Sequence, residues 1–302
     1  MTTQTLGPAD KQLWLAAAKP PMYGVAIMPI CVGSAIAYAE TGLFNLSVFA
    51  TFLLAAVLLL VWENLSNDVF DAETGIDVNK HHSLVNLTRN RGLIFGLGNL
   101  CLALGIAGIV SISLWQRDLT VLGLVLLCCV LGYLYQGPPF RLGYHGLGEI
   151  LCFLSFGPLA VEAAYYSQTQ SQSAAAWVAA AVIGLTTTLV LFCSHFHQVE
   201  DDRAAGKRSP IVRLGTRRGA ALLPWVCAVA LGLVLVAIAI GWFSAWTALS
   251  LIGLLPAIAL CRHVGRYHDQ PARVSNAKFL AIRFHFCSGL LLCLGVLLPA
   301  SL

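Results

Sequence analysis

Long apolar stretches separated by short polar segments dominate the chain. A helix that crosses a bilayer needs roughly 20 mostly apolar residues. Runs of about this length lie at 22–39, 44–64, 93–115, 119–136, 149–166, 177–197, 221–241, 245–261 and 283–301. The uncharged stretch 219–261 is too long for one helix, and it is divided at 241–244, where Trp242 and Phe243 suit a membrane interface. The pattern predicts an all-α polytopic membrane protein with nine transmembrane helices around a central cavity.

Composition and charge agree with this interpretation. Hydrophobic residues make up 58% of the 302 residues and charged residues only 11%, which is far from the composition of soluble domains. If the N-terminus is cytoplasmic, Arg117 alone among the 18 Lys and Arg residues falls in an outer loop. Because positively charged loops stay in the cytoplasm, we expect that orientation. The basic residues are then topology signals next to the lipid bilayer, and no nucleic acid partner is expected.

One segment carries far more acid than a membrane boundary normally does. ENLSNDVFDAETGIDVNK, from Glu63 to Lys80, holds five carboxylates directly after an apolar run. On a helix, Asn64, Asp68 and Asp71 fall within a stripe about 60° wide, with Asn67 beside it. Desolvating clustered carboxylates is costly unless a cation compensates them. The segment therefore predicts a cation site at the end of a membrane helix.

A similar segment, SHFHQVEDDRAAG, follows 131 residues later. It aligns His195, Gln198 and Asp202 with Asn64, Asn67 and Asp71, and we expect it to form an equivalent helical stripe with Asp201 on its flank. Four spans separate the two copies, around 63–92 and 194–219, so they run in the same direction within one domain covering 1–302. Two such helices facing each other would enclose a cavity near the cytoplasmic side of the membrane.

Hard oxygen donors without cysteine suit Mg²⁺, which usually takes one or two carboxylates together with substrate phosphates and water. The predicted metal ligands are Asp68, Asp71, Asp77, Asp202 and Asp201. Basic residues beside the acids suit a diphosphate, and those nearest are Lys80, Arg141, Lys207 and Arg208. The combination predicts a diphosphate ligand whose long apolar tail lies in the membrane.

Several motifs carry a resemblance to a known family. NDVFDAETGID resembles the first aspartate-rich motif, NDxxDxxxxxD, of the UbiA superfamily of intramembrane aromatic prenyltransferases. EDDRAAGKRSPIVRLG, KPPMYGVAIMPICVG and YQGPPFRLGYHGLGE are similar to segments of its naphthoate branch. The second motif of the superfamily usually reads DxxxD, whereas this chain has Gln198 at the first position. That departure leaves the number of metal ions open.

The resemblance implies a reaction. It is the Mg²⁺-dependent transfer of a prenyl group, for this branch a twenty-carbon phytyl group, from its diphosphate to 1,4-dihydroxy-2-naphthoate. The ring loses its carboxyl group as carbon dioxide, which gives a phylloquinone or menaquinone precursor. The predicted catalytic residues are Asp68, Asp71, Asp202 and His195. The predicted substrate-binding residues are Asn64, Asn67, Lys80, Arg141, Gln198, Lys207, Arg208, Lys19 and Tyr135, with Lys19 a partner for the acceptor carboxylate.

Two alternatives stay open at this point. One is a prenyltransferase of the same superfamily with another acceptor, such as homogentisate, or another prenyl length. The other is a cation transporter that uses the carboxylates as an ion path. The acids cluster at one side of the membrane and not at its midplane, the repeat is parallel, and the basic loops would repel cations. The choice between plasma and thylakoid membrane is also open.

Overall fold

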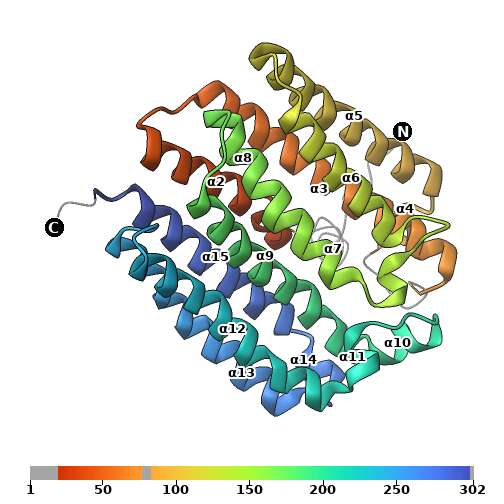
Figure 1. The fold of residues 1–302 in the computed structure, drawn as a ribbon. Coiled ribbons are helices and arrows are strands. Elements are labelled where there is room, and N and C mark those ends of the chain that lie inside the picture. Colours follow the sequence, from red (N-terminus) through yellow and green to blue (C-terminus); the bar gives the residue numbers. More distant parts are fainter. Residues whose placement is uncertain (1–19, 77–82, 300–302) are drawn as a thin grey trace, which may run out of the picture.

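The computed structural model describes residues 20–76 and 83–299, and in these ranges all regular structure is helical (Figure 1). The long helices are α2 (Tyr23–Thr41), α3 (Leu46–Thr74), α5 (Arg91–Gln116), α6 (Thr120–Gln136), α7 (Gly148–Leu154) continuing through a π-helical turn (Ser155–Leu159) into α8 (Ala160–Thr169), α9 (Ala174–Ser194), α12 (Thr216–Ala239), a 3₁₀ segment (Ala245–Gly253) continuing into α13 (Leu254–Tyr267), and α15 (Ala277–Leu297). Short helices join them: Pro20–Met22, α4 (Leu84–Thr88), Leu142–His145, His195–His197, α10 (Val199–Ala204), α11 (Pro210–Leu214) and α14 (Pro271–Val274).

The helices have the length and composition of membrane spans. Eight helical segments in the described ranges are long and apolar enough to cross a bilayer, and Thr120–Gln136 is a shorter apolar helix. The predicted all-α polytopic class is therefore confirmed. The break at 241–244 is also confirmed, because α12 ends at Ala239 and Gly241 has a left-handed φ of 78°. The count of nine spans and the cytoplasmic N-terminus stay predictions.

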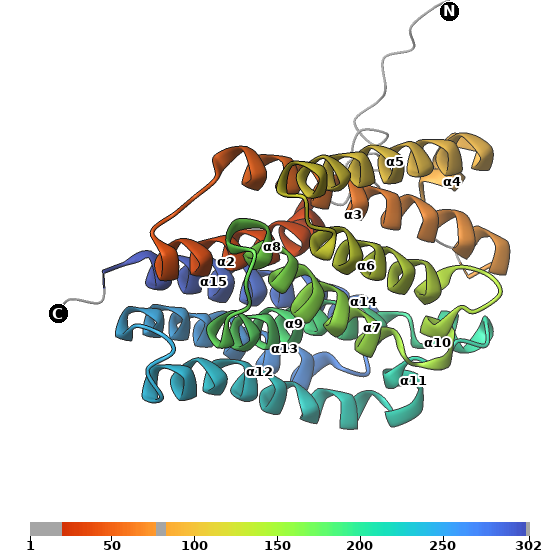
Figure 2. The same ribbon diagram turned by 45° about the horizontal axis from the view of Figure 1, so that its top comes forward.

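Small residues let the helices approach one another closely. A Cβ atom at Gly33 of α2 would lie 2.4 Å from the carbonyl oxygen of Val161 in α8, and one at Gly157 would lie 2.5 Å from the carbonyl oxygen of Ala180 in α9. Lipid tails are as apolar as the side chains, so close backbone packing of this kind holds membrane helices together. Figures 1 and 2 show α9 and α15 in the interior of the bundle, with α3, α5 and α6 along one side.

The first acidic segment forms the end of α3 and the second follows α9, and these two helices run in the same direction and end at the same end of the molecule (Figure 1). α3 continues ten residues past the predicted apolar run and ends at Gly75, where φ is 73°. After each segment comes a five-residue helix, α4 or α11, and then a long helix. This order agrees with the predicted parallel repeat, which stays a prediction together with the single domain.

The predicted stripe in the second copy is wrong in one respect. α9 ends at Ser194, a 3₁₀ turn follows, and Gln198 (φ −111°) precedes the separate helix α10. His195, Gln198 and Asp202 therefore do not lie along one continuous helix. The break after Ser194 brings the carboxylate of Asp202 within 3.1 Å of His195 Nδ1.

Candidate active site

A cavity of about 840 Å³ lies between the two acidic segments, within the size range of small-molecule sites. α3 contributes Glu63, Asn64 and Asn67, and the segment after α9 contributes His197 and Gln198. Deeper in, the lining is apolar and includes Phe52, Ala56, Leu59, Val125, Leu151 and Phe156. The predicted cavity is thus present, polar at the end where the acidic segments meet and apolar further along α3.

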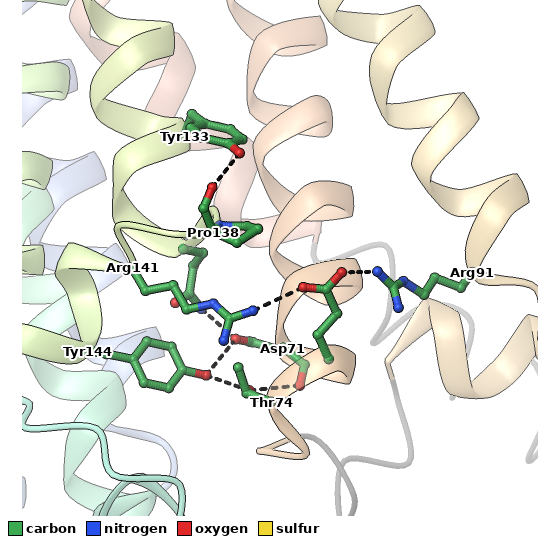
Figure 3. A network of polar contacts seen from close by, with 9 residues as sticks. Asp71, Thr74, Arg91, Tyr133, Pro138, Arg141 and Tyr144 are labelled. Carbon is green, nitrogen blue, oxygen red and sulfur yellow. Dashed lines mark hydrogen bonds and ion pairs between the residues drawn. The ribbon is translucent and has the colours of Figure 1, made fainter.

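The acidic end of α3 is held by neutral hydrogen-bond donors from other segments. Gln136 at the end of α6 donates its amide Nε2 to Asp71 Oδ1 over 2.6 Å. The Tyr144 hydroxyl lies 3.5 Å from the same oxygen and 2.6 Å from the hydroxyl of Thr74 (Figure 3). Asp68 is 1% exposed and accepts the backbone N–H of Leu84 at 3.0 Å. These bonds fix the positions of both carboxylates on α3, one and four residues beyond Asn67 of the cavity wall.

Glu73 organises the outer edge of this region. Its carboxylate accepts a hydrogen bond from Arg141 at 3.0 Å and also pairs with Arg91 (Figure 3). Arg141 itself has a left-handed φ of 45°. The predicted diphosphate-binding Arg141 is therefore placed beside the first acidic segment, with its guanidinium engaged by Glu73.

The second acidic segment is built differently, around a buried ion network. Asp202 is 1% exposed, and its carboxylate lies 3.1 Å from His195 Nδ1 and 3.7 Å from Lys207 Nζ. Burial raises the pKa of Asp202, but the bond to His195, the charge of Lys207 and the Ser209 hydroxyl outweigh it and hold that pKa below its ordinary value. The Nε2 atom of His195 lies 3.5 Å from Glu149. His195 thus stands between two carboxylates.

The connection between α6 and α7 joins the two segments. Tyr144 in this connection contacts Asp71 with its hydroxyl, and Lys207 Nζ lies 5.7 Å from the centre of the Tyr144 ring. The backbone N–H of Arg208 donates to the carbonyl of Tyr144 at 2.8 Å. Asp71 and Asp202 are therefore linked through Tyr144 and Lys207 at the same end of the molecule.

The predicted site residues fall into distinct groups. Asn64, Asn67, Tyr135 and Gln198 line the cavity; Asp68, Asp202, His195 and Lys207 are buried beside it; Asp71 and Arg141 are partly buried; Asp201 and Arg208 are exposed. Lys19, Asp77 and Lys80 lie outside the described residues. The histidine on the cavity wall is His197, whereas His195, predicted to face the cavity, turns to Asp202.

Besides Tyr144 and Glu73, three further residues of this region were not predicted to take part. They are Gln136, Glu149 and Glu63, and each is a polar residue next to or within an apolar run. That isolation is the signal that sequence reasoning had available, since polar side chains in membrane segments usually have a partner or a function.

The described residues contain no group of three or more His, Cys, Asp or Glu side chains close enough to hold a metal ion by themselves. The four predicted aspartates that the structure describes, Asp68, Asp71, Asp201 and Asp202, therefore do not assemble a metal site made of protein ligands alone. This agrees with the coordination habit of Mg²⁺, which draws much of its shell from substrate phosphates and water. Oxygen donors are nevertheless the main polar groups here, with Asn67 and Gln198 amides on the wall and carboxylates next to them.

An all-helical membrane bundle with a cavity between two acidic helix ends is the arrangement of an intramembrane prenyltransferase. The chain matches the UbiA prenyltransferase family over residues 26–288 and belongs to it. It is an enzyme of this class, as the motifs predicted.

The chain is also similar to two named relatives and to one solved structure. The chain is 54% identical over 289 residues to a 2-carboxy-1,4-naphthoquinone phytyltransferase of Synechocystis sp., covering 95% of this chain and 94% of the relative. It is 39% identical to the chloroplastic 2-carboxy-1,4-naphthoquinone phytyltransferase of Arabidopsis thaliana, covering 96% and 78%. The fold is similar to a UbiA homologue from Archaeoglobus fulgidus bound to GPP and Mg²⁺, with a TM-score of 0.56 at 15% identity, covering 93% and 99%.

Proposed function

We propose that this enzyme transfers a phytyl group from phytyl diphosphate to 1,4-dihydroxy-2-naphthoate, with Mg²⁺ and with loss of the ring carboxyl group. The observation that carries the proposal is the cavity, which has a polar end between the acidic segments and an apolar remainder. The names of the two relatives support the phytyl donor and a naphthalene acceptor with a carboxyl group. The acceptor in those names is the two-electron oxidised form of the one proposed here.

The donor set fits a hard divalent cation. Amide oxygens of Asn67 and Gln198 with carboxylates of Asp71 and Asp202 are the ligand types that Mg²⁺ prefers, and the Archaeoglobus fulgidus homologue bound to GPP and Mg²⁺ supports such an ion. When bound, the ion offsets the charge of the departing diphosphate. The buried Lys207, 6% exposed beside Asp202, adds positive charge at the same end.

The rest of the cavity accounts for the remaining requirements. Its apolar wall holds the prenyl tail and excludes water, which would otherwise capture an allylic cation. Both acidic segments act on one ligand within one domain, and we place this end of the bundle on the cytoplasmic side of a plasma or thylakoid membrane. The basic residues that follow each segment, Arg89 and Arg91 in the first and Lys207 and Arg208 in the second, support that side.

The test uses the full chain in lipid nanodiscs. It is incubated with phytyl diphosphate and dihydroxynaphthoate labelled in the carboxyl carbon, with Mg²⁺ or with EDTA. We expect prenylated naphthoquinol and one labelled carbon dioxide per product, both abolished by EDTA. Homogentisate in place of the naphthoate is the matched comparison. Prenylated homogentisate without a naphthoate product would contradict the proposed acceptor, and product formation in EDTA would contradict the metal requirement.

A further inference from the structure

Glu63 is an ionisable residue inside a membrane helix. It lies in the middle part of α3, within the 29-residue span Leu46–Thr74, and it lines the cavity. A carboxylate at such a position is costly to desolvate. Neither the metal site nor the diphosphate site proposed above uses it.

Glu63 marks the boundary between the two halves of the cavity wall on α3. Glu63, Asn67 and Asp71 are spaced by four residues and follow one face of the helix, with Glu63 about 6 Å from Asn67 and about 12 Å from Asp71 along the axis. In the other direction the next cavity residues on α3 are Trp62, Leu60, Leu59 and Ala56. Glu63 is therefore the last charged or amide side chain that α3 contributes to the cavity wall in this direction.

This boundary between polar and apolar wall matches the junction in the donor between the diphosphate and the first prenyl carbon. A prenyl diphosphate whose charged head lies at Asn67 and Asp71, and whose tail follows the apolar wall, places its first prenyl carbon next to Glu63. That carbon is where the ring of the acceptor must approach. With the donor placed in this way, the carboxylate of Glu63 would lie beside the reacting carbon and further from the diphosphate than Asn67 and Asp71 do.

The surroundings leave few other groups for proton transfer. Among the described residues that line the cavity, the charged ones are Glu63 and Lys278, and His197 is the histidine. Tyr135, Cys129 and Cys152 line the same cavity and lie within electrostatic range of Glu63. Near neutral pH the ordinary cysteine, tyrosine and lysine side chains keep their protons, so the carboxylate and the histidine are the groups of this set that can accept one.

We propose that Glu63 is the catalytic base that takes a hydroxyl proton from the aromatic acceptor as its ring attacks the first prenyl carbon; this inference rests on the proposed function. The C–O bond to the diphosphate breaks, and its electron pair leaves with the diphosphate. A ring electron pair forms the C–C bond at the carbon that carries the carboxyl group. The neighbouring O–H pair becomes part of a carbonyl, and the proton passes to Glu63.

The second half of the cycle returns the base to its starting state. The carboxyl group leaves as carbon dioxide, and the electron pair of its C–C bond restores the aromatic ring. The carbonyl oxygen then recovers the proton from Glu63 as it becomes a hydroxyl again. No oxidant or reductant is needed, and the enzyme ends the cycle unchanged.

The test compares Glu63→Gln and Glu63→Asp with wild type. Glutamine keeps the shape but cannot accept the proton, so kcat falls by about 100-fold or more, while the affinity for phytyl diphosphate with Mg²⁺ stays near the wild-type value. Wild-type kcat falls on acidification as the base is protonated, and this limb disappears in Glu63→Gln. Glu63→Asp keeps the limb at a reduced kcat. Glu162→Gln, a buried glutamate of α8 not found in the cavity wall, is the matched control with wild-type kcat.

The experiment distinguishes failure of the proposed function from failure of the proposed role of Glu63. If wild type forms no prenylated naphthoquinol, the proposed function fails and this inference with it. If wild type is active and Glu63→Gln keeps a near-normal kcat with the same pH profile, only the role of Glu63 is overturned. It is also overturned if both variants lose phytyl diphosphate binding, because Glu63 would then be a structural residue.

Discussion

The two acidic segments occupy the same end of the bundle but reach their positions by different means. The first is the regular end of one 29-residue helix, and its Asp71 is held by the neutral donors Gln136 and Tyr144. The second is a broken segment in which Asp202 lies on a six-residue helix and pairs with Lys207 and His195. The first segment is shaped by helix periodicity, and the second by an ion network.

The difference assigns different tasks to the two aspartates. Asp202 is buried and supports the positions of Lys207 and His195, so its removal affects the fold as well as the ligand. Asp71 is partly buried and aligned with two cavity residues of its own helix, Asn67 and Glu63. We therefore expect loss of Asp71 to act on activity alone, whereas loss of Asp202 acts on activity and stability together.

The largest expected effect is that of Asp71→Asn on turnover. Asparagine keeps the shape of Asp71 but removes the negative charge that would hold the divalent ion, so kcat/KM for phytyl diphosphate falls by about 10³-fold, measured as prenyl transfer in nanodiscs. Asp118→Asn is the control, since this partly exposed carboxylate lies between α5 and α6 at the opposite end of the bundle. Asp68→Ala, Asp71→Ala and Asp202→Ala are each expected to abolish turnover. Wild-type rates in all three would refute the site.

The stability of Asp202→Ala tests whether the second acidic segment, unlike the first, supports the fold. Loss of this carboxylate leaves the ammonium of Lys207 buried without it, which lowers the free energy of unfolding by about 3 kcal/mol. Thermal unfolding without metal or substrate measures the effect, and Asp71→Ala is expected to shift the transition much less. The double variant Asp202→Ala with Lys207→Met removes both charges and recovers part of the loss. Equal destabilisation by Asp71→Ala and Asp202→Ala would erase the distinction between the segments.

The sequence was a good guide wherever local periodicity decides the structure. The apolar runs reflect bilayer thickness and coincide with the helices, and the break at 241–244 was placed correctly because its glycine adopts a conformation that other residues avoid. Asn64 and Asn67 were placed on the cavity wall by helix geometry alone.

Contacts between distant segments were beyond that reasoning. Gln136 and Asp71 are 65 positions apart, and their bond follows from the packing of α6 against α3. The break after Ser194 accompanies the pairing of His195 with Asp202, which a helical wheel does not contain. As a result, the sequence assigned the cavity-facing role to His195, although His197 lies on the wall.

A smaller effect is expected for Gln136→Leu, which tests how the first segment is held. Leucine fills similar space but cannot donate to Asp71, so the carboxylate loses its shortest described bond. Supporting groups of this kind are worth about 10-fold in metal affinity or activity, and we expect the loss at low Mg²⁺ with partial recovery at high Mg²⁺. The control is Gln116→Leu, whose amide bonds to the Ser167 carbonyl at the opposite end. An equal loss in both variants would indicate a general packing defect.

The smallest expected effect, and the most direct test of the asymmetry, is a gain in Gln198→Asp. Gln198 lines the cavity at the position aligned with Asn67, and it stands where the superfamily usually has aspartate. A carboxylate there adds charge beside Asp202, so the Mg²⁺ concentration for half-maximal activity should fall severalfold. Ser194→Asp puts the same charge on the same wall one turn earlier and should give no such gain. If Gln198→Asp instead needs more Mg²⁺ for half-maximal activity, position 198 faces the substrate and not the ion. The first segment would then bind the metal, and the second segment would serve mainly to place Lys207.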